Sequence, residues 1–264
     1  MNPNIAIAIL LITFVLLIMI KCPITFSMII STAFTMLYIQ VPVMTLVQQM
    51  SKQLNSFSLL AIPFFILMGE IMAAGGISSR LLAFANVCVG QITGGLAHVN
   101  VLASMLFGGI SGSAIADVSS LGALEIPMME EAGYEKDFSI AVTVASSCQG
   151  LIIPPSHNMV LYSMVAGGVS VGSLFCAGYI PGIMLGVFIM GMCYIISKKK
   201  HYPKGKKLPF KEALRVTKDT FFAMLAMVII IGGVSAGFFT ATESAAVACI
   251  YCLFVGFFIY KIGR

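Results

Sequence analysis

The chain has 264 residues, of which 59% are hydrophobic and only 9% are charged, and its formal net charge is +5. A soluble domain of this length needs far more charge to cover its surface, so the composition excludes a soluble globular protein. Long apolar stretches fill most of the sequence, which predicts an all-α, polytopic protein embedded in the lipid bilayer.

Apolar segments follow one another along the chain at about 5–20, 24–40, 57–73, 94–128, 138–166, 170–196, 220–238 and 241–260. Lys21, Cys22 and Pro23 predict a tight turn between the first two segments. Residues 42–56 and 77–91 are more polar and amphipathic, which is typical of helices at the membrane interface, and Arg80 would reach from the second of them to water.

A strongly basic stretch fixes the orientation. Residues 197–219 contain nine Lys or Arg against two acids, Glu212 and Asp219. Such a loop belongs in the cytoplasm, and counting spans back from it places the acidic loop at 128–137 on the same side. Because the basic stretch lies between two membrane spans, we do not expect it to bind nucleic acid.

Residues 94–128 are too long for one simple span. Small residues interrupt their centre, namely Gly108, Gly109, Ser111, Gly112 and Ser113. Each arm has about 15 residues and is roughly 22 Å long, which is too short to cross a hydrocarbon core of about 30 Å. The pattern predicts a re-entrant helical hairpin that enters from the cytoplasm and returns to it.

Residues 138–166 contain the stretch "GLIIPPSHN". Pro154 and Pro155 cannot continue a helix interior, so we expect a broken transmembrane helix with halves at about 138–152 and 157–166. Unwinding frees backbone carbonyls that a cation could satisfy, such as those of Gly150, Leu151 and Ile152, while the N-terminus of the second half suits an anion.

A simple proline kink with a glycine-rich packing turn is the alternative for these two segments. Two breaks in neighbouring segments, both rich in small polar residues, favour a transporter site instead.

Several stretches resemble one family of transporters. They are "ASMLFGGISGSAIADVSSLG" (103–122), "IPMMEEAGYEKDFSIAVTVASS" (126–147), "IIPPS" (152–156), "LLAIPFFILMGEIMAAGGIS" (59–78) and "TATESAAVACIY" (240–251). Together they are similar to the large membrane subunit of tripartite ATP-independent periplasmic (TRAP) transporters, the DctM-like proteins.

The resemblance implies an elevator-type member of the ion transporter superfamily in the bacterial or archaeal cytoplasmic (inner) membrane. Such a protein imports small organic anions, such as carboxylates or sialic acids, with sodium as the coupling ion and no other cofactor. It works with two partners, a small membrane subunit and a periplasmic substrate-binding protein.

This chain departs from the family pattern in one large way. Family members carry two inverted repeats, each with a hairpin and a broken helix, whereas this chain has one of each. We expect N-terminal spans and an interfacial segment at 1–56, a first repeat at 57–196, the basic cytoplasmic loop at 197–219, and an incomplete second repeat at 220–264. The chain would then be the N-terminal half of a permease.

The resemblance also implies a site. The hairpin tip and the break would together hold one sodium and part of the anion, through Ser111, Gly112, Ser113, Pro154, Pro155, Ser156 and Asn158. Sodium would be held by Ser111, Ser113 and backbone oxygens near Ile152.

Two carboxylates are candidates for a supporting role. Asp117 follows the tip by one turn and could tune the cation site, or equally pair with a neighbour. Glu243 lies in the first turn of the helix that begins with "TATES", where ordinary capping is the favoured interpretation.

The other polar residues receive ordinary interpretations. We expect Glu70 and Glu125 to be solvated near cytoplasmic ends, and His157 to be satisfied at a helix start. His98 could form a hydrogen bond between the hairpin arms.

No nucleophile–base pair, metal-ligand spacing or phosphate loop is present in the sequence, so we do not expect an enzyme. Two alternatives remain open: a truncated, non-transporting membrane protein or scaffold, and a dicarboxylate–sodium symporter of the same superfamily. The block at 103–122 favours the TRAP type over the symporter.

Overall fold

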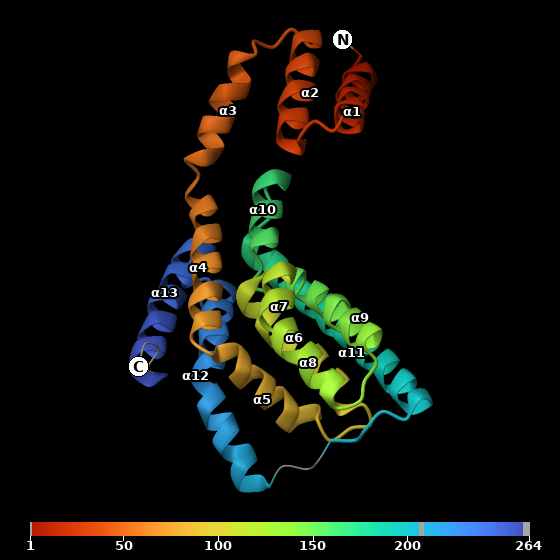
Figure 1. Ribbon diagram of the computed structural model, residues 1–264. Coiled ribbons are helices and arrows are strands. Elements are labelled where there is room, and N and C mark those ends of the chain that lie inside the picture. The colour runs from red at the N-terminus through yellow and green to blue at the C-terminus, as the bar shows by residue number, and fades with distance from the viewer. Residues whose placement is uncertain (1, 206–208, 261–264) are drawn as a thin grey trace. The chain divides into compact units, whose positions relative to one another are not determined.

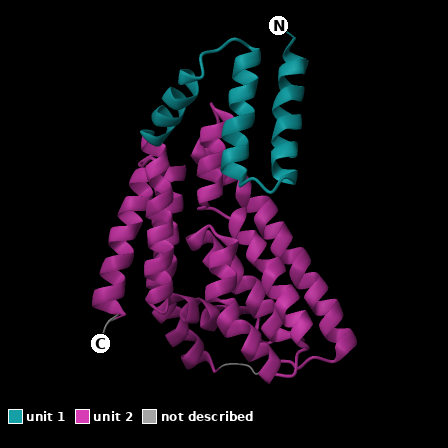
Figure 2. Cartoon of the chain, turned by 45° about the horizontal axis from the view of Figure 1, so that its top comes forward, with its two compact units in different colours: residues 1–56 teal, residues 57–264 magenta. Residues whose placement is uncertain are grey.

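The computed structural model describes residues 2–205 and 209–260, and within these ranges the chain forms thirteen α-helices and no strand. It divides into two compact units, residues 1–56 and 57–264 (Figure 2). The prediction of an all-α, polytopic membrane protein is confirmed.

The first unit consists of α1 (Pro3–Met19), α2 (Ile24–Tyr38) and α3 (Met44–Leu54). α1 and α2 pack against each other and are joined by the predicted turn, in which Lys21 adopts a positive φ of 63°. α1 buries none of its residues, so its apolar side chains are left for lipid. α3 is the amphipathic helix that the sequence predicts for residues 42–56.

The second unit contains the remaining helices (Figure 1). A 3₁₀ turn (Phe57–Leu60) leads into α4 (Ala61–Ala74), and α5 (Ile77–Val89) follows. The later helices are α6 (Gly95–Ser111), α7 (Ala114–Ser120), α8 (Gly122–Glu131), α9 (Lys136–Ser147), α10 (His157–Ala166), α11 (Val171–Lys200), α12 (Phe210–Ser235) and α13 (Ala241–Phe254), which continues into a π-helical turn (Val255–Ile259).

Among the described residues, three helical segments are long and apolar enough to cross a membrane: Phe57–Ala74, Val171–Lys200 and Ala241–Ile259. The unit's core lies where α4, α5, α6, α12 and α13 pack together, and it is filled by side chains such as Phe65, Met68, Leu81, Phe107 and Ile230. Large apolar side chains such as Ile180, Phe188 and Phe258 point outward instead, as expected of a surface that faces lipid.

The predicted hairpin is present, with α6 as its first arm and α7 plus α8 as its second. The second arm is longer than expected, because its helix continues to Glu131 and ends only before Gly133, which has a φ of 90°. Residues 128–131 are therefore helix and not loop. That the hairpin enters the membrane and leaves on the same side stays a prediction.

The predicted broken helix is also present. α9 ends in a 3₁₀ turn (Cys148–Leu151), the chain bends through residues 152–156, and α10 begins at His157. The Pro154–Pro155 peptide bond is cis.

The basic stretch at 197–219 contains more helix than predicted. α11 continues to Lys200, because lysines in the last turn of a helix complement its dipole, and α12 begins directly after Pro209. Residues 206–208 of this stretch lie outside the described ranges.

The hairpin base, which we define as residues 93–94, 134–138 and 200–204, ties this loop to both arms. Thr93 forms an isolated bridge with Lys204, and the backbone nitrogen of Gly94 donates to the carbonyl of Pro203 at 3.2 Å. The ring centroids of Tyr134 and Tyr202 are 4.4 Å apart. Burial raises the pKa of Tyr134 to about 12, so its phenol stays neutral. Ring packing and backbone hydrogen bonds thus hold the two arms and the loop together at the hairpin base.

Candidate functional site

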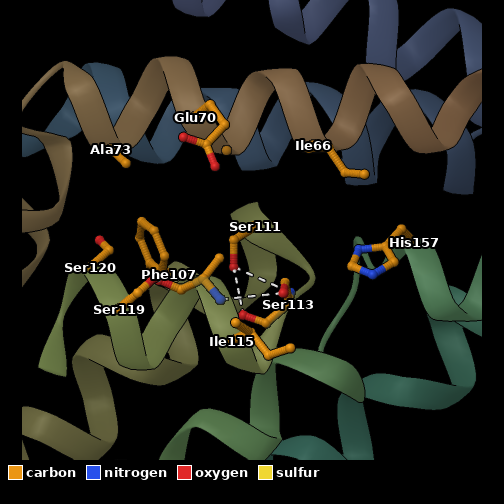
Figure 3. Close-up of a pocket in the computed structure, with 12 residues that line it drawn as sticks. Ile66, Glu70, Ala73, Phe107, Ser111, Ser113, Ile115, Ser119, Ser120 and His157 are labelled. Atoms are coloured by element: carbon orange, nitrogen blue, oxygen red, sulfur yellow. Dashed lines mark hydrogen bonds between the residues drawn. The ribbon is translucent and has the colours of Figure 1, made fainter.

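The hairpin tip, residues 111–113, is shaped by its own hydrogen bonds (Figure 3). Gly112 ends α6 with a φ of 61°, a conformation that glycine adopts without strain. The backbone nitrogen of Ser113 then donates to Oγ of Ser111 at 3.3 Å, and Oγ of Ser113 accepts from the nitrogen of Ala116 at 3.3 Å, which caps α7.

The tip lies directly against the break. A Cβ added at Gly112 would lie 3.0 Å from both the backbone nitrogen of His157 and the Cα of Ser156. A Cβ added at Gly108 would lie only 2.4 Å from the Cα of Gly150. Backbone therefore meets backbone at these positions, and the two interruptions found in the sequence form one place in the fold.

The carbonyls near the tip differ from those expected. A Cβ added at Gly178 of α11 would lie 2.5 Å from the carbonyl oxygen of Ile152, so this oxygen packs against α11. The carbonyl oxygens of Pro154 and Pro155 instead come within 3.2 Å of Cβ positions at Gly109 and Gly112, respectively. The prolines themselves thus offer backbone oxygens on the side of the tip.

Two polar atoms at the start of α10 have no partner among the described residues. Ser156 is 0% exposed, and its Oγ neither forms a hydrogen bond nor caps α10. The Nδ1 atom of His157 also lacks a partner, so the expectation of a satisfied histidine is not met at this atom. Buried polar atoms are nearly always paired, and unpaired ones point to a ligand or water.

A cleft of about 440 Å³ opens beside the tip. Its lining includes Ser111 and Ser113 of the tip, His157 of α10 and Glu70 of α4, whose carboxylate points across the cleft toward the tip (Figure 3). Glu70 is exposed, as predicted, but its place in this cleft was not foreseen. The sequence signal that could have indicated it is a carboxylate within an apolar run. In the structure, the neighbouring Gly69 brings α4 close to the tip, because a Cβ added there would lie 3.4 Å from the Cα of Ser111.

Two of the predicted site residues lie elsewhere. Asn158 is exposed and does not line the cleft. Glu243 forms a capping box: its Oε2 accepts from the backbone nitrogen of Thr240 at 2.8 Å, and its own nitrogen donates to Oγ1 of Thr240 at 3.3 Å. The capping interpretation of Glu243 is confirmed.

The environments of three other polar residues differ from the expected ones or were left open by the sequence. Glu125 is buried and not solvated, because the longer second arm places it mid-helix against α9. His98 does not bridge the arms, because its Nδ1 donates to the carbonyl of Gly94 in its own first turn at 3.0 Å. Asp117 is buried and has no hydrogen-bond partner in the described part of the chain.

Comparison with known protein families shows which family has this sequence pattern. The family model described as the DctM component of the tripartite ATP-independent periplasmic transporter matches residues 11–263. The chain belongs to this family.

Individual DctM relatives agree. The chain is 44% identical over 240 residues to the sialic acid TRAP transporter large permease protein SiaM of Vibrio cholerae, covering 90% of this chain and 56% of the relative. It is 44% identical over 205 residues to the C4-dicarboxylate TRAP transporter large permease protein DctM of Pseudomonas aeruginosa, covering 78% and 48%. An uncharacterized protein of Salmonella typhimurium, YgiK, is 42% identical over 244 residues, covering 91% and 56%. The chain spans about half the length of these curated relatives.

Proposed function

We propose that this chain forms the N-terminal half of the large permease subunit of a sodium-coupled TRAP importer of small organic anions. It would act in the cytoplasmic (inner) membrane with a small membrane subunit and a periplasmic substrate-binding protein. The observation that carries the proposal is the meeting of the hairpin tip and the break, where the buried hydroxyl of Ser156 has no partner among the described residues.

The sodium part of the proposal rests on the oxygens gathered there. Hydroxyl and carbonyl oxygens are hard donors of the kind that hard cations prefer. The tip supplies the hydroxyls of Ser111 and Ser113, and the break supplies that of Ser156 and the carbonyl of Pro155. Gly112 lets these two sets approach, because any side chain there would collide with the break.

The anion part rests on α10. This ten-residue helix begins at His157, which lines the cleft. The free N–H groups and positive dipole end at a helix start favour a carboxylate, and half-helix N-termini serve this purpose in transporters built on broken helices. The named substrates of two relatives, sialic acid and C4-dicarboxylates, both carry carboxylates.

The test is Ser156→Ala in a complete transporter that carries this half, with uptake driven by a sodium gradient. Losing one oxygen that contacts a cation weakens binding by about 1.5–3 kcal/mol, so the apparent sodium affinity should fall by about tenfold or more. Stabilisation by sodium in a thermal-shift assay should weaken in parallel.

Ser163→Ala is the matched control, because Ser163 lies half-buried on the same helix and its hydroxyl is already bonded to the carbonyl of Val169. It should leave the sodium dependence unchanged. Wild-type sodium dependence in Ser156→Ala, and also in Ser113→Leu, would place the sodium site elsewhere.

A further inference from the structure

Buried polar side chains line the contact between α6 and α9. Nδ2 of Asn100 donates to Oγ1 of Thr143 at 2.7 Å, and Oγ of Ser146 donates to Oδ1 of Asn100 at 2.7 Å. Oγ of Ser104 donates to Oγ of Ser146 at 3.2 Å. All four side chains are buried. Oγ1 of Thr143 donates to the carbonyl of Ser139 at 2.9 Å, so each hydroxyl proton of this network already has an acceptor.

Two carboxyl groups of the second hairpin arm are buried next to this contact. Asp117 of α7 and Glu125 of α8 are each only 1% exposed, and none of their four oxygens has a hydrogen-bond partner among the described residues. The hydroxyl of Ser104 lies beside Asp117 but gives its proton to Ser146. The two carboxyls are eight residues apart on a nearly continuous helix, so they share one side of the arm.

No cation faces these carboxyls in residues 2–205 and 209–260. α7 and α8 pack against each other, α6 and α9, and α7 also contacts the 3₁₀ turn at Cys148–Leu151. Ser120 of α7 is hydrogen-bonded to Ser78 of α5. The cation on α5 is Arg80, whose guanidinium donates to the carbonyls of Gly75 and Gly76. The other ionisable groups on these elements lie at exposed positions, or, for His98, are bonded to the element's own backbone; they are Glu130, Glu131, Lys136, Asp137, Cys148 and His98. Segments outside this chain could not reach the carboxyls without opening the fold, since the chain's own residues already cover them.

Burying an ionised carboxylate without a partner is far more costly than burying a neutral carboxyl. A metal ion would offset the charge but needs several more oxygens, and no group of three or more His, Cys, Asp or Glu side chains suited to a metal exists in the described part of the chain. A proton needs no such shell. We propose that Asp117 and Glu125 form a proton-binding site, in which both carboxyls are neutral while the second arm is packed on α9 and release their protons when that packing opens.

This site is distinct from the tip and the cleft, because neither carboxyl lines the cleft. It goes beyond the proposed uptake and does not depend on it, since it follows from burial alone. Its consequence is that the stability of the packed hairpin depends on pH. An unfolded chain ionises both carboxyls above their ordinary range, whereas burial makes the folded chain hold these protons to higher pH, so the folded state loses stability as pH rises.

The test is thermal unfolding of the complete permease in detergent from about pH 5 to about pH 8. The ratio of folded to unfolded protein should fall by up to about tenfold per pH unit for each of the two carboxyls. The double variant Asp117→Asn, Glu125→Gln carries neutral groups of similar shape and should lose this part of the slope. The control Glu130→Gln, Glu131→Gln changes exposed acids and should keep the wild-type slope.

A second readout is independent of unfolding. The infrared spectrum of the wild-type permease at neutral pH should contain the C=O stretch of a protonated carboxyl, and the double variant should lack it. Absence of this band in the wild type would overturn the proposal, even if the double variant did not fold. An unchanged pH slope in a folded double variant would also overturn it. So would a stabilisation by sodium, relative to potassium, that the wild type shows and the double variant loses, because the carboxyls would then be ionised metal ligands.

Discussion

The two ends of the hairpin are held in opposite ways. At the base, aromatic rings pack together and polar groups pair: the ring centroids of Phe138 and Tyr202 are 5.3 Å apart, and Oη of Tyr202 accepts from the backbone nitrogen of Glu135 at 3.3 Å. At the tip, glycine backbones touch the break, and the nearby Ser156 hydroxyl has no partner among the described residues.

This difference suggests that the two ends of the hairpin have different roles, structural at the base and ligand-binding at the tip. Packed aromatic rings and paired polar groups fix the position of the base, where the hydroxyl of Tyr134 is a single buried oxygen without a partner among the described residues. Close backbone contacts fix a position as well, and they leave hydroxyls and carbonyls available. Under the proposed function, the base would hold the arms in place and the tip would keep its oxygens for a transported ion.

The largest expected effect is at the tip. Gly108→Ala places a methyl group 2.4 Å from the Cα of Gly150, and backbone atoms cannot move aside as a flexible side chain would. We expect sodium-driven uptake by a complete transporter to be lost and the melting temperature to fall.

Gly191→Ala in α11 is the control, because a Cβ there meets nothing within 4 Å. It should leave uptake intact, with a gain of at most about 1 kcal/mol from better helix propensity. Normal uptake by Gly108→Ala would mean that tip and break do not need this contact.

An intermediate effect is expected at the base. Tyr202→Ala removes a buried ring that packs against two others, and should lower the free energy of unfolding by about 3 kcal/mol. The sodium affinity of the molecules that remain folded should not change. Tyr202→Phe loses only the hydroxyl acceptor and should cost about 1 kcal/mol. A shift in sodium affinity in either variant would show that the base also affects ion binding, contrary to the division of roles between the two ends.

The smallest effect is expected from the ion pair between Lys200 and Glu135, which are both exposed at the base. Exposed pairs contribute little because water and salt screen them. Lys200→Met, Glu135→Gln and the double variant should therefore unfold at the same temperature as the wild type. A clear coupling between the two substitutions in a double-mutant cycle would show that the base depends on charge as well as on stacking.

The sequence predicted the backbone irregularities well and the side-chain environments poorly. Pro154, Pro155 and Gly112 were interpretable because their effects on the backbone are local. The burial of Glu125, the unpartnered Nδ1 atom of His157 and the position of Glu70 at the cleft were missed. Each of these depends on which distant segments pack together, and neither periodicity nor composition contains that information.

The packing of the break against α11 also has a consequence for how the protein is made. During translation α9, the break and α10 are synthesised before α11. The carbonyl of Ile152 is therefore made before Gly178 and Gly182, which lie against the break in the folded protein. Synthesis of these further residues, about thirty, takes roughly two to six seconds at about 5–20 residues per second. Irregular backbone is not tolerated against lipid. During that interval the nascent break has to stay within the insertion machinery or in a wet environment, and α11 closes over it only after its own insertion.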